Sequence, residues 1–301
     1  MFKYSIIRDR KEYAKINRLV LAVEIMKRII VPILILTLSL SLVASAPSPK
    51  VKSIDELAKS VTEAKISKLN GTTREWSWGS AIGKNRRDFT KALNYGRDLG
   101  GRYVVFTNTP KVYLTFDLGY VNQYTYELLD KLKKKRVLGV FFMTLEVVKE
   151  NPKLVKRILD DGHQIGNHSS NHPNYSKISL TRMKSETIPF HKYMQKKYKY
   201  NMTLFRFPEG AYNEKSLYFL NKIGYTSLFW SFGYDDWDRN NQPGEAYALG
   251  KIMSNIKPGA VILLHGMSKT NANIIDNIIN ETKKKGYKIV TYEPQKLFKN
   301  Q

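Results

Sequence analysis

The 301-residue sequence contains no cysteine. That absence excludes disulfide bonds, thiolate metal sites and cysteine nucleophiles, so any metal must be held by histidine, carboxylate or water. Acidic residues are scarce too: 26 Asp and Glu stand against 50 Lys and Arg, which gives a formal net charge of +24. Hydrophobic residues make up 42% of the chain, which is enough to build the core of one large domain.

The excess of positive charge predicts an anionic partner. The charge is spread along the chain, with short basic runs at 133–136 and 283–285. The sequence carries no RNA-binding signature, zinc finger or basic heptad region, so nucleic acid is not the expected partner. An anionic cell-wall polymer or a membrane surface is the specific interpretation. A lysine-rich solvated surface without a dedicated partner is the alternative.

An uncharged, apolar run covers residues 29–46 and directly follows Lys27 and Arg28. A basic stretch followed by an apolar one is typical of an export signal. The run is also about long enough to span a bilayer. A retained anchor that leaves the main domain outside the membrane is therefore the alternative to a cleaved signal peptide.

Three segments are expected along the chain. Residues 1–46 form the N-terminal segment with its signal peptide or membrane anchor, 47–75 a polar linker with a short helix over 54–69, and 76–301 the main domain. Met26 is an alternative start to the chain, because the residues before it are mixed and charged, unlike a signal peptide.

Strand-like and helix-like segments alternate after residue 111. Strands are expected at 112–116, 137–143, 164–166, 204–206, 226–231, 260–264 and 288–291. Helices are expected at 124–135, 152–160, 180–197, 214–223, 245–256 and 271–285. This alternation predicts a parallel sheet, and about seven such units favour a closed barrel over an open sheet. Active residues of such barrels lie where strands end and the following loops begin.

Ionisable side chains follow five of these expected strands. They are Asp117, His168 with His172, Arg206, Asp236 and His265. Because the carboxyl ends of parallel strands meet at one rim, we expect these groups to lie close together.

The spacing of His168 and His172 predicts two imidazoles on one face of a helical turn, able to bind one cation. With no thiolate in the chain, Zn²⁺ is the natural ion for such a pair. A solvated surface pair is the alternative. The other two histidines after residue 160 receive no role: His163 is expected in a strand or loop, and His191 on a helix surface.

Asp117 ends an apolar strand, and a buried carboxylate needs a partner. Arg206 is the expected partner that keeps it ionised. The functional interpretation is a general base acting on water, and the alternative is a carboxylate that caps a turn. His265 would protonate a leaving amine while Asp236 holds its imidazole.

Two apolar side chains complete the candidate site. Trp237 and Leu263 are expected to form the wall of an acetyl-sized pocket, and ordinary core packing is the alternative for both.

These residues together resemble the polysaccharide deacetylase family, which carries the NodB homology domain (carbohydrate esterase family 4). The resemblance extends from about residue 76 to near the C-terminus, on five ordered motifs at 115–119, 168–172, 206–210, 236–237 and 263–265. Further stretches at 113–120, 230–231 and 240–242 are similar to the branch that deacetylates muramic acid in peptidoglycan, a step toward the muramic δ-lactam of spore cortex.

The resemblance implies a fold and a set of roles. The fold is a distorted (β/α) barrel with about seven parallel strands. Asp117 is implied as the base with Arg206 as its tether, and His265 as the acid with Asp236 as its tether. His168 and His172 are implied as ligands of a divalent metal, most simply Zn²⁺, and the backbone N–H of Glu209 as a donor to the oxyanion. Peptidoglycan glycan strands are the implied partner.

Leu118 departs from the family pattern. The family's first motif usually carries a second Asp here, which completes the metal site, whereas leucine has no donor atom. We expect weakened metal binding, with water, substrate oxygens, Asp235 or Asp238 filling the third position. Two alternatives remain open: an N-acetylglucosamine deacetylase of peptidoglycan or chitin-like oligomers, and a non-catalytic wall-binding pseudoenzyme.

Overall fold

The computed structural model describes residues 18–28, 52–76, 101–102 and 109–293. Contacts divide the chain into two units, Met1–Lys52 and Ser53–Gln301. In the first unit, residues 18–28 are helical. Among the described helices, none combines the length and apolar character needed to cross a membrane. The expected signal or anchor at 29–46 lies outside the described residues.

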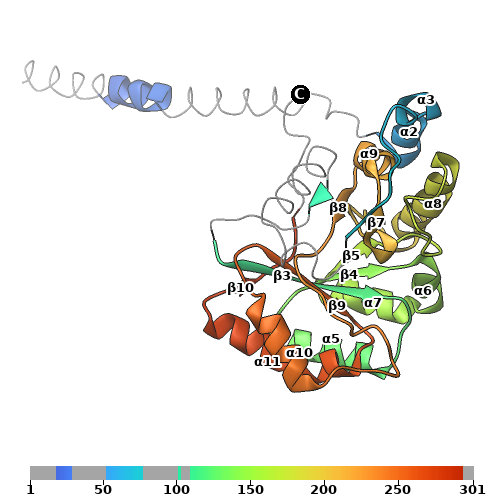
Figure 1. The fold of residues 1–301 in the computed structure, drawn as a ribbon. Coiled ribbons are helices and arrows are strands. Elements are labelled where there is room, and N and C mark those ends of the chain that lie inside the picture. Colours follow the sequence, from blue (N-terminus) through green and yellow to red (C-terminus); the bar gives the residue numbers. More distant parts are fainter. Residues whose placement is uncertain (1–17, 29–51, 77–100, 103–108, 294–301) are drawn as a thin grey trace, which may run out of the picture. The chain divides into compact units, whose positions relative to one another are not determined.

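Parallel strands form the body of the second unit (Figure 1). In the described part of the chain, eight of them join in the order β10-β3-β4-β5-β6-β8-β2, with β9 paired to β3. Their bounds are β2 (Gly101–Arg102), β3 (Lys111–Leu118), β4 (Val140–Met143), β5 (Gln164–Asn167), β6 (Leu204–Phe205), β8 (Thr226–Leu228), β9 (Ala260–His265) and β10 (Lys288–Ile289). The sheet curls into a half-barrel, so the predicted distorted (β/α) barrel is confirmed.

Helices cover the outside of the curled sheet (Figure 1). They are α5 (Gln123–Lys135), α6 (Leu145–Glu150), α7 (Pro152–Asp160), α8 (Leu180–Tyr198), α9 (Glu214–Lys222), α10 (Glu245–Ser254) and α11 (Lys269–Lys284). Each helix begins or ends within two residues of its predicted bounds, except α6, which was not predicted. Its length of six residues is too short to show a clear helical period.

The segment at 53–75 is part of the compact unit, which corrects the prediction of a linker at these positions. It forms α2 (Ile54–Lys59), α3 (Glu63–Ile66) and β1 (Arg74–Glu75), and β1 pairs antiparallel with β7 (Ala211–Tyr212). The reason is its sparse set of apolar residues: Ile54, Val61 and Ile66 are all buried in the core. A segment with so few apolar residues has the composition of a linker. Only the domain surface on which these residues pack shows that the segment is folded.

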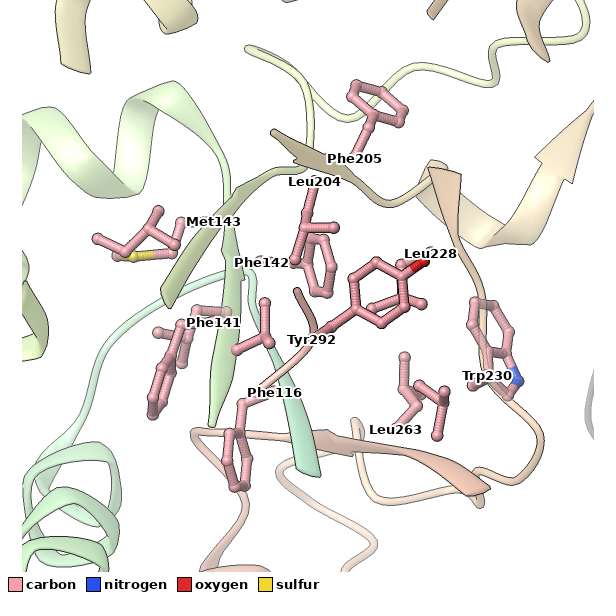
Figure 2. Packing of buried hydrophobic residues seen from close by; sticks show 14 of the residues in the cluster. Phe116, Phe141, Phe142, Met143, Leu204, Phe205, Leu228, Trp230, Leu263 and Tyr292 are labelled. Carbon is pink, nitrogen blue, oxygen red and sulfur yellow. The ribbon is translucent and has the colours of Figure 1, made fainter. Parts of the chain in front are cut away.

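Alternate residues of the strands face opposite sides of the sheet. Phe116 and Phe141 stack on the outer side, with ring centroids 4.9 Å apart, whereas Phe142, Leu228 and Leu263 lie within the curve (Figure 2). The inner side thus carries an apolar base beneath the rim where the strands end.

Gly166 makes room for one of these inner rings. A Cβ atom at Gly166 would lie 2.3 Å from Cε1 of Phe142, closer than any real contact. The ring cannot easily move aside, because it stacks 4.1 Å from the guanidinium carbon of Arg206. We therefore expect Gly166→Ala to lower the free energy of unfolding by about 2 kcal/mol, the usual cost of overpacking.

The matched control is Gly250→Ala. Gly250 lies in α10, and an added Cβ there has no atom within 4 Å. We expect this change to raise the free energy of unfolding by about 0.5–1 kcal/mol through helix propensity. Urea denaturation of both variants measures the difference, and equal stability of the two would refute the packing argument.

Candidate active site

Asp117 and Arg206 form a buried ion pair at the rim of the half-barrel. Asp117 lies near the end of β3, and Arg206 directly follows β6; Nη1 of Arg206 donates to Oδ1 of Asp117 over 2.8 Å. The other guanidinium nitrogens donate to the carbonyls of Leu228 and Phe229. Every nitrogen of the buried Arg206 therefore has a partner, and the side chain is fixed in place.

The charge of Asp117 depends on its surroundings. Burial by itself raises the pKa of its carboxyl group, but the positive charge and hydrogen bond of Arg206, together with His265, outweigh burial and lower the pKa below its usual value. The carboxylate is therefore ionised at neutral pH and able to accept a proton.

His168 faces the same carboxylate. Its Nε2 lies 3.8 Å from Oδ2 of Asp117, and its Nδ1 lies 2.8 Å from the backbone oxygen of Arg206. Since that oxygen can only accept, Nδ1 carries the proton and Nε2 keeps its lone pair. Burial lowers the pKa of His168 to about 4, so the ring is neutral, as a metal ligand must be.

The segment that carries His168 and His172 is a loop, which corrects the predicted helical turn. Ser169 and His172 have φ of 72° and 55°, in the left-handed region, and the two imidazole centroids nevertheless lie 4.9 Å apart. Buried Glu186 of α8 holds the loop by accepting the backbone N–H groups of Ser170 and Asn171. Sequence inspection missed Glu186, because no local pattern separates it from other helix carboxylates.

The imidazoles of His168 and His172 suit a divalent cation, but residue 118, where the family usually has a third metal ligand, does not. Leu118 is fully buried, and its Cδ2 lies 2.6 Å from the place where a Cβ of Gly266 would be. Its alkyl group therefore fills space beside the residue that follows His265, and it supplies no donor.

The acidic residues that were expected to replace the missing ligand do not do so. Asp235 is exposed, and Oδ1 of Asp238 accepts the backbone N–H of Asn240. Within the described residues, no group of three His, Asp or Glu side chains is arranged to hold a metal ion. The described site thus offers two imidazoles as metal ligands. Two protein ligands bind a metal ion more weakly than the usual three.

His265 ends β9 and lies beside Asp117, its partner in the parallel register of β3 and β9. Its Nδ1 lies 2.7 Å from Oδ1 of Asp236, and its backbone N–H donates to Oδ2 over 2.7 Å. Burial alone lowers the pKa of His265, but the carboxylate of Asp236 outweighs burial and raises it above 6.5. The imidazole can therefore be protonated near neutral pH and act as an acid.

The three remaining predicted residues lie around this rim or beneath it. Glu209 sits in the short 3-10 turn Pro208–Gly210 with φ of 58°, a strained conformation for a residue other than glycine. Trp237 is 56% exposed on the loop between β8 and α10, where a ligand can reach it. Leu263 is buried within the curve of the sheet (Figure 2).

The other two histidines lie apart from these groups. His163 is buried, and its Nδ1 accepts the backbone N–H of Gly139. His191 is buried as well, which corrects the prediction of a helix surface: its ring packs on Tyr225 and bonds the hydroxyl over 2.7 Å. Burial lowers the pKa of each to about 4, so both are neutral structural groups.

The rim thus combines the ionised carboxylate of Asp117, the protonatable imidazole of His265, the neutral imidazole of His168 and the nearby ring of His172. A base and an acid on neighbouring strands suit the cleavage of an amide, in which water loses a proton and the leaving nitrogen gains one. The geometry alone leaves the substrate open.

Known proteins resemble this chain over most of its length. The family model for polysaccharide deacetylase matches residues 105–228. The peptidoglycan-N-acetylmuramic acid deacetylase PdaA of Bacillus subtilis is 38% identical over 217 residues, which cover 70% of this chain and 81% of that protein. The peptidoglycan-N-acetylglucosamine deacetylase PgdA of Listeria monocytogenes is 33% identical over 183 residues, 61% of this chain and 38% of that protein.

Solved structures with similar folds come from the same family of proteins. The structure of Bacillus subtilis PdaA, a family 4 carbohydrate esterase, superposes with a TM-score of 0.68 at 33% identity, covering 74% of this chain and 96% of that one. A family 4 pseudoenzyme of Bacillus anthracis has a TM-score of 0.59 at 27% identity, covering 63% and 66%. A mutant of it is described as having restored enzymatic activity. On the extent of these matches, and with the motifs placed on one rim, the chain belongs to the polysaccharide deacetylase family.

Proposed function

We propose that this chain is a de-N-acetylase of peptidoglycan that removes the acetyl group of N-acetylmuramic acid. The observation that carries the proposal is the pair of neighbouring strand ends, β3 and β9, which set ionised Asp117 beside His265. The similarity to PdaA supports the choice of sugar, and formation of the muramic δ-lactam of spore cortex is the proposed context.

Each charged residue has a role in the proposed reaction. Asp117 accepts a proton from the attacking water, and Arg206 keeps its carboxylate ionised and oriented. His265 donates a proton to the departing nitrogen, while Asp236 fixes its tautomer. The backbone N–H of Glu209 is the proposed donor to the oxyanion, and Trp237 and Leu263 are the proposed contacts of the acetylated sugar.

His168 and His172 are the residues that would hold a divalent metal, with Zn²⁺ the best match to two imidazoles. When bound, such an ion supplies a Lewis acid that polarises oxygen and makes water more acidic. The neutral ring of His168, with its Nδ1 proton engaged by a carbonyl, is already prepared for that role.

Export follows from the proposed substrate, because peptidoglycan lies outside the membrane. The apolar run at 29–46 is the proposed signal peptide or anchor. The net charge of +24 suits a surrounding rich in anionic wall polymers or an anionic membrane surface. Residues 53–301, rather than 76–301, are the proposed catalytic unit.

The missing metal ligand at Leu118 supports a second candidate function, that of a wall-binding pseudoenzyme. The third metal position holds an alkyl group, and a pseudoenzyme is among the proteins that share this fold. The same rim would then bind glycan without releasing acetate.

One experiment separates the two candidates. Residues 47–301 are incubated with Zn²⁺ and glycan strands stripped of stem peptides, and acetate is measured for the natural protein, Leu118→Asp and Leu118→Asn. We expect the natural protein to release acetate, and Leu118→Asp to bind Zn²⁺ at least about tenfold more tightly by calorimetry, because it adds a charged ligand. Leu118→Asn is the uncharged control of the same size.

The alternative outcomes are distinct. Acetate release by Leu118→Asp alone identifies the natural chain as a pseudoenzyme. Release from intact peptidoglycan or chitin oligomers, but not from stripped glycan, assigns the N-acetylglucosamine specificity found in the name of PgdA. Equal Zn²⁺ affinity of all three proteins overturns the view that position 118 faces the metal.

A further inference from the structure

A buried hydrogen-bond network surrounds the carboxylate of Asp236, which has no exposed surface. Two of its donors belong to His265, through Nδ1 and the backbone N–H. A third donor comes from a different element: Nδ2 of Asn271, in the first turn of α11, donates to Oδ2 of Asp236. Asn271 is itself buried, so no water competes for this bond.

The orientation of the Asn271 amide is set by Tyr234. The hydroxyl of Tyr234 donates to Oδ1 of Asn271, which turns Nδ2 toward Asp236. Nδ2 also donates to the backbone oxygen of His265 over 3.1 Å. Burial, together with the charge of Asp236, raises the pKa of Tyr234, so its hydroxyl keeps the proton that it donates.

A second connection joins the same two segments. The side-chain nitrogen of Gln242 donates to the backbone oxygens of Asp236 and Asp238, and its oxygen accepts from the hydroxyl of Ser268 and the backbone N–H of Thr270. The loop that carries Asp236 is therefore tied to the start of α11 at two places. Displacement of one segment would displace the other.

We propose that Asn271 and Tyr234 are positioning residues that hold His265 in its working orientation by fixing the carboxylate of Asp236. A carboxylate can turn about its own bond, and donors from two directions stop that rotation. With Asp236 fixed, Nδ1 of His265 stays protonated, and Nε2 is the nitrogen left to exchange a proton with a ligand. This inference rests on the proposed role of His265 as the acid.

A purely structural role is the competing explanation. In that case Asn271 would only stabilise the first turn of α11, and its loss would lower stability without changing the chemistry of His265. The two explanations differ in what they predict for the titration of His265, so that titration is the deciding measurement.

The test uses Asn271→Leu and Tyr234→Phe, both close in size to the natural residues. The control is Asn273→Leu, the same change at an exposed position two residues along α11. The titration of His265 is followed by NMR of the imidazole, which is practical because the chain has five histidines. Steady-state acetate release gives kcat and KM. The charged groups around His265 are Asp236, Asp117 and Arg206, and none of them is altered.

We expect Asn271→Leu to lower the pKa of His265 toward 6.5, because a misplaced Asp236 attracts the imidazolium less. We expect kcat to fall about 10- to 100-fold with little change in KM, as is usual for partners that orient a functional group. Tyr234→Phe should reduce kcat about fivefold, the effect of one neutral hydrogen bond. Asn273→Leu should match the natural protein.

An unchanged pKa of His265 in both variants would overturn the proposal, as would a loss of kcat that the control shares. If Asn271→Leu does not fold, Tyr234→Phe decides, because it removes a single oxygen. If the natural protein releases no acetate, the NMR titration still decides the positioning role. Failure of the proposed function and failure of this inference are therefore separate results.

Discussion

Replacement of Asp117 by Asn should reduce acetate release about 10²- to 10⁴-fold, the usual contribution of a general base. The amide keeps the size of the carboxylate and can still accept the hydrogen bond from Nη1 of Arg206, so the fold should survive. It cannot accept a proton from water at neutral pH. Measurement of kcat with saturating glycan, alongside the melting temperature, separates chemistry from stability.

The matched control for this variant is Asp161→Asn. Asp161 is a half-buried carboxylate that binds the basic side chains of Lys133 and Arg157, and it precedes β5 at the opposite end of the sheet. We expect its loss to leave kcat unchanged. Full activity of Asp117→Asn would exclude Asp117 as the base and would shift attention to the neutral imidazole of His168.

Replacement of Arg206 by Met should have the largest effect on stability. Arg206 is fully buried against Phe142, and its loss leaves the carboxylate of Asp117 without its ion-pair partner in a buried place. Breaking such a pair from one side costs about 3–5 kcal/mol. Denaturant unfolding at pH 7 measures the loss directly.

The double variant Asp117→Asn with Arg206→Met tests the cause. If the unpaired carboxylate is responsible, the double variant should be more stable than Arg206→Met alone. The pH dependence of acetate release by Arg206→Met is an independent test of the ion pair. Arg206 lowers the pKa of Asp117, so without it the carboxyl group stays protonated to a higher pH, and any remaining acetate release should rise only at higher pH. A double variant as unstable as Arg206→Met would show that lost packing on Phe142 dominates instead.

Much of this fold could be predicted from the sequence because its elements are regular. The strand at 111–118 and the helix at 152–160 are bounded by clear changes of pattern, and the structure places them within two residues of expectation. The order of strand and helix alone implied the parallel sheet, and hence the rim that gathers Asp117, Arg206 and His265.

The parts that escaped prediction depend on contacts between distant segments. The buried residues of α2 and α3 are too few to show a period, so only their packing against the domain reveals their role. The loop between His168 and His172 has helical spacing, yet Glu186, a residue from α8, holds it in left-handed turns. Asn271 likewise gives no local signal, because its partner Asp236 lies 35 residues away.

The pairing of β3 with β9 also determines when the site can form during synthesis. Thr115 of β3 bonds Ile262 of β9 across a separation of 147 residues, and His265 arrives on that late strand. Such distant contacts form slowly, and only after the second partner has been made. The β9 side of β3, which carries Asp117, therefore stays unpaired by this strand until residues 260–265 have emerged. A prematurely ended chain that lacks β9 would have no His265 beside Asp117, so the two side chains can act together only after β9 has been made.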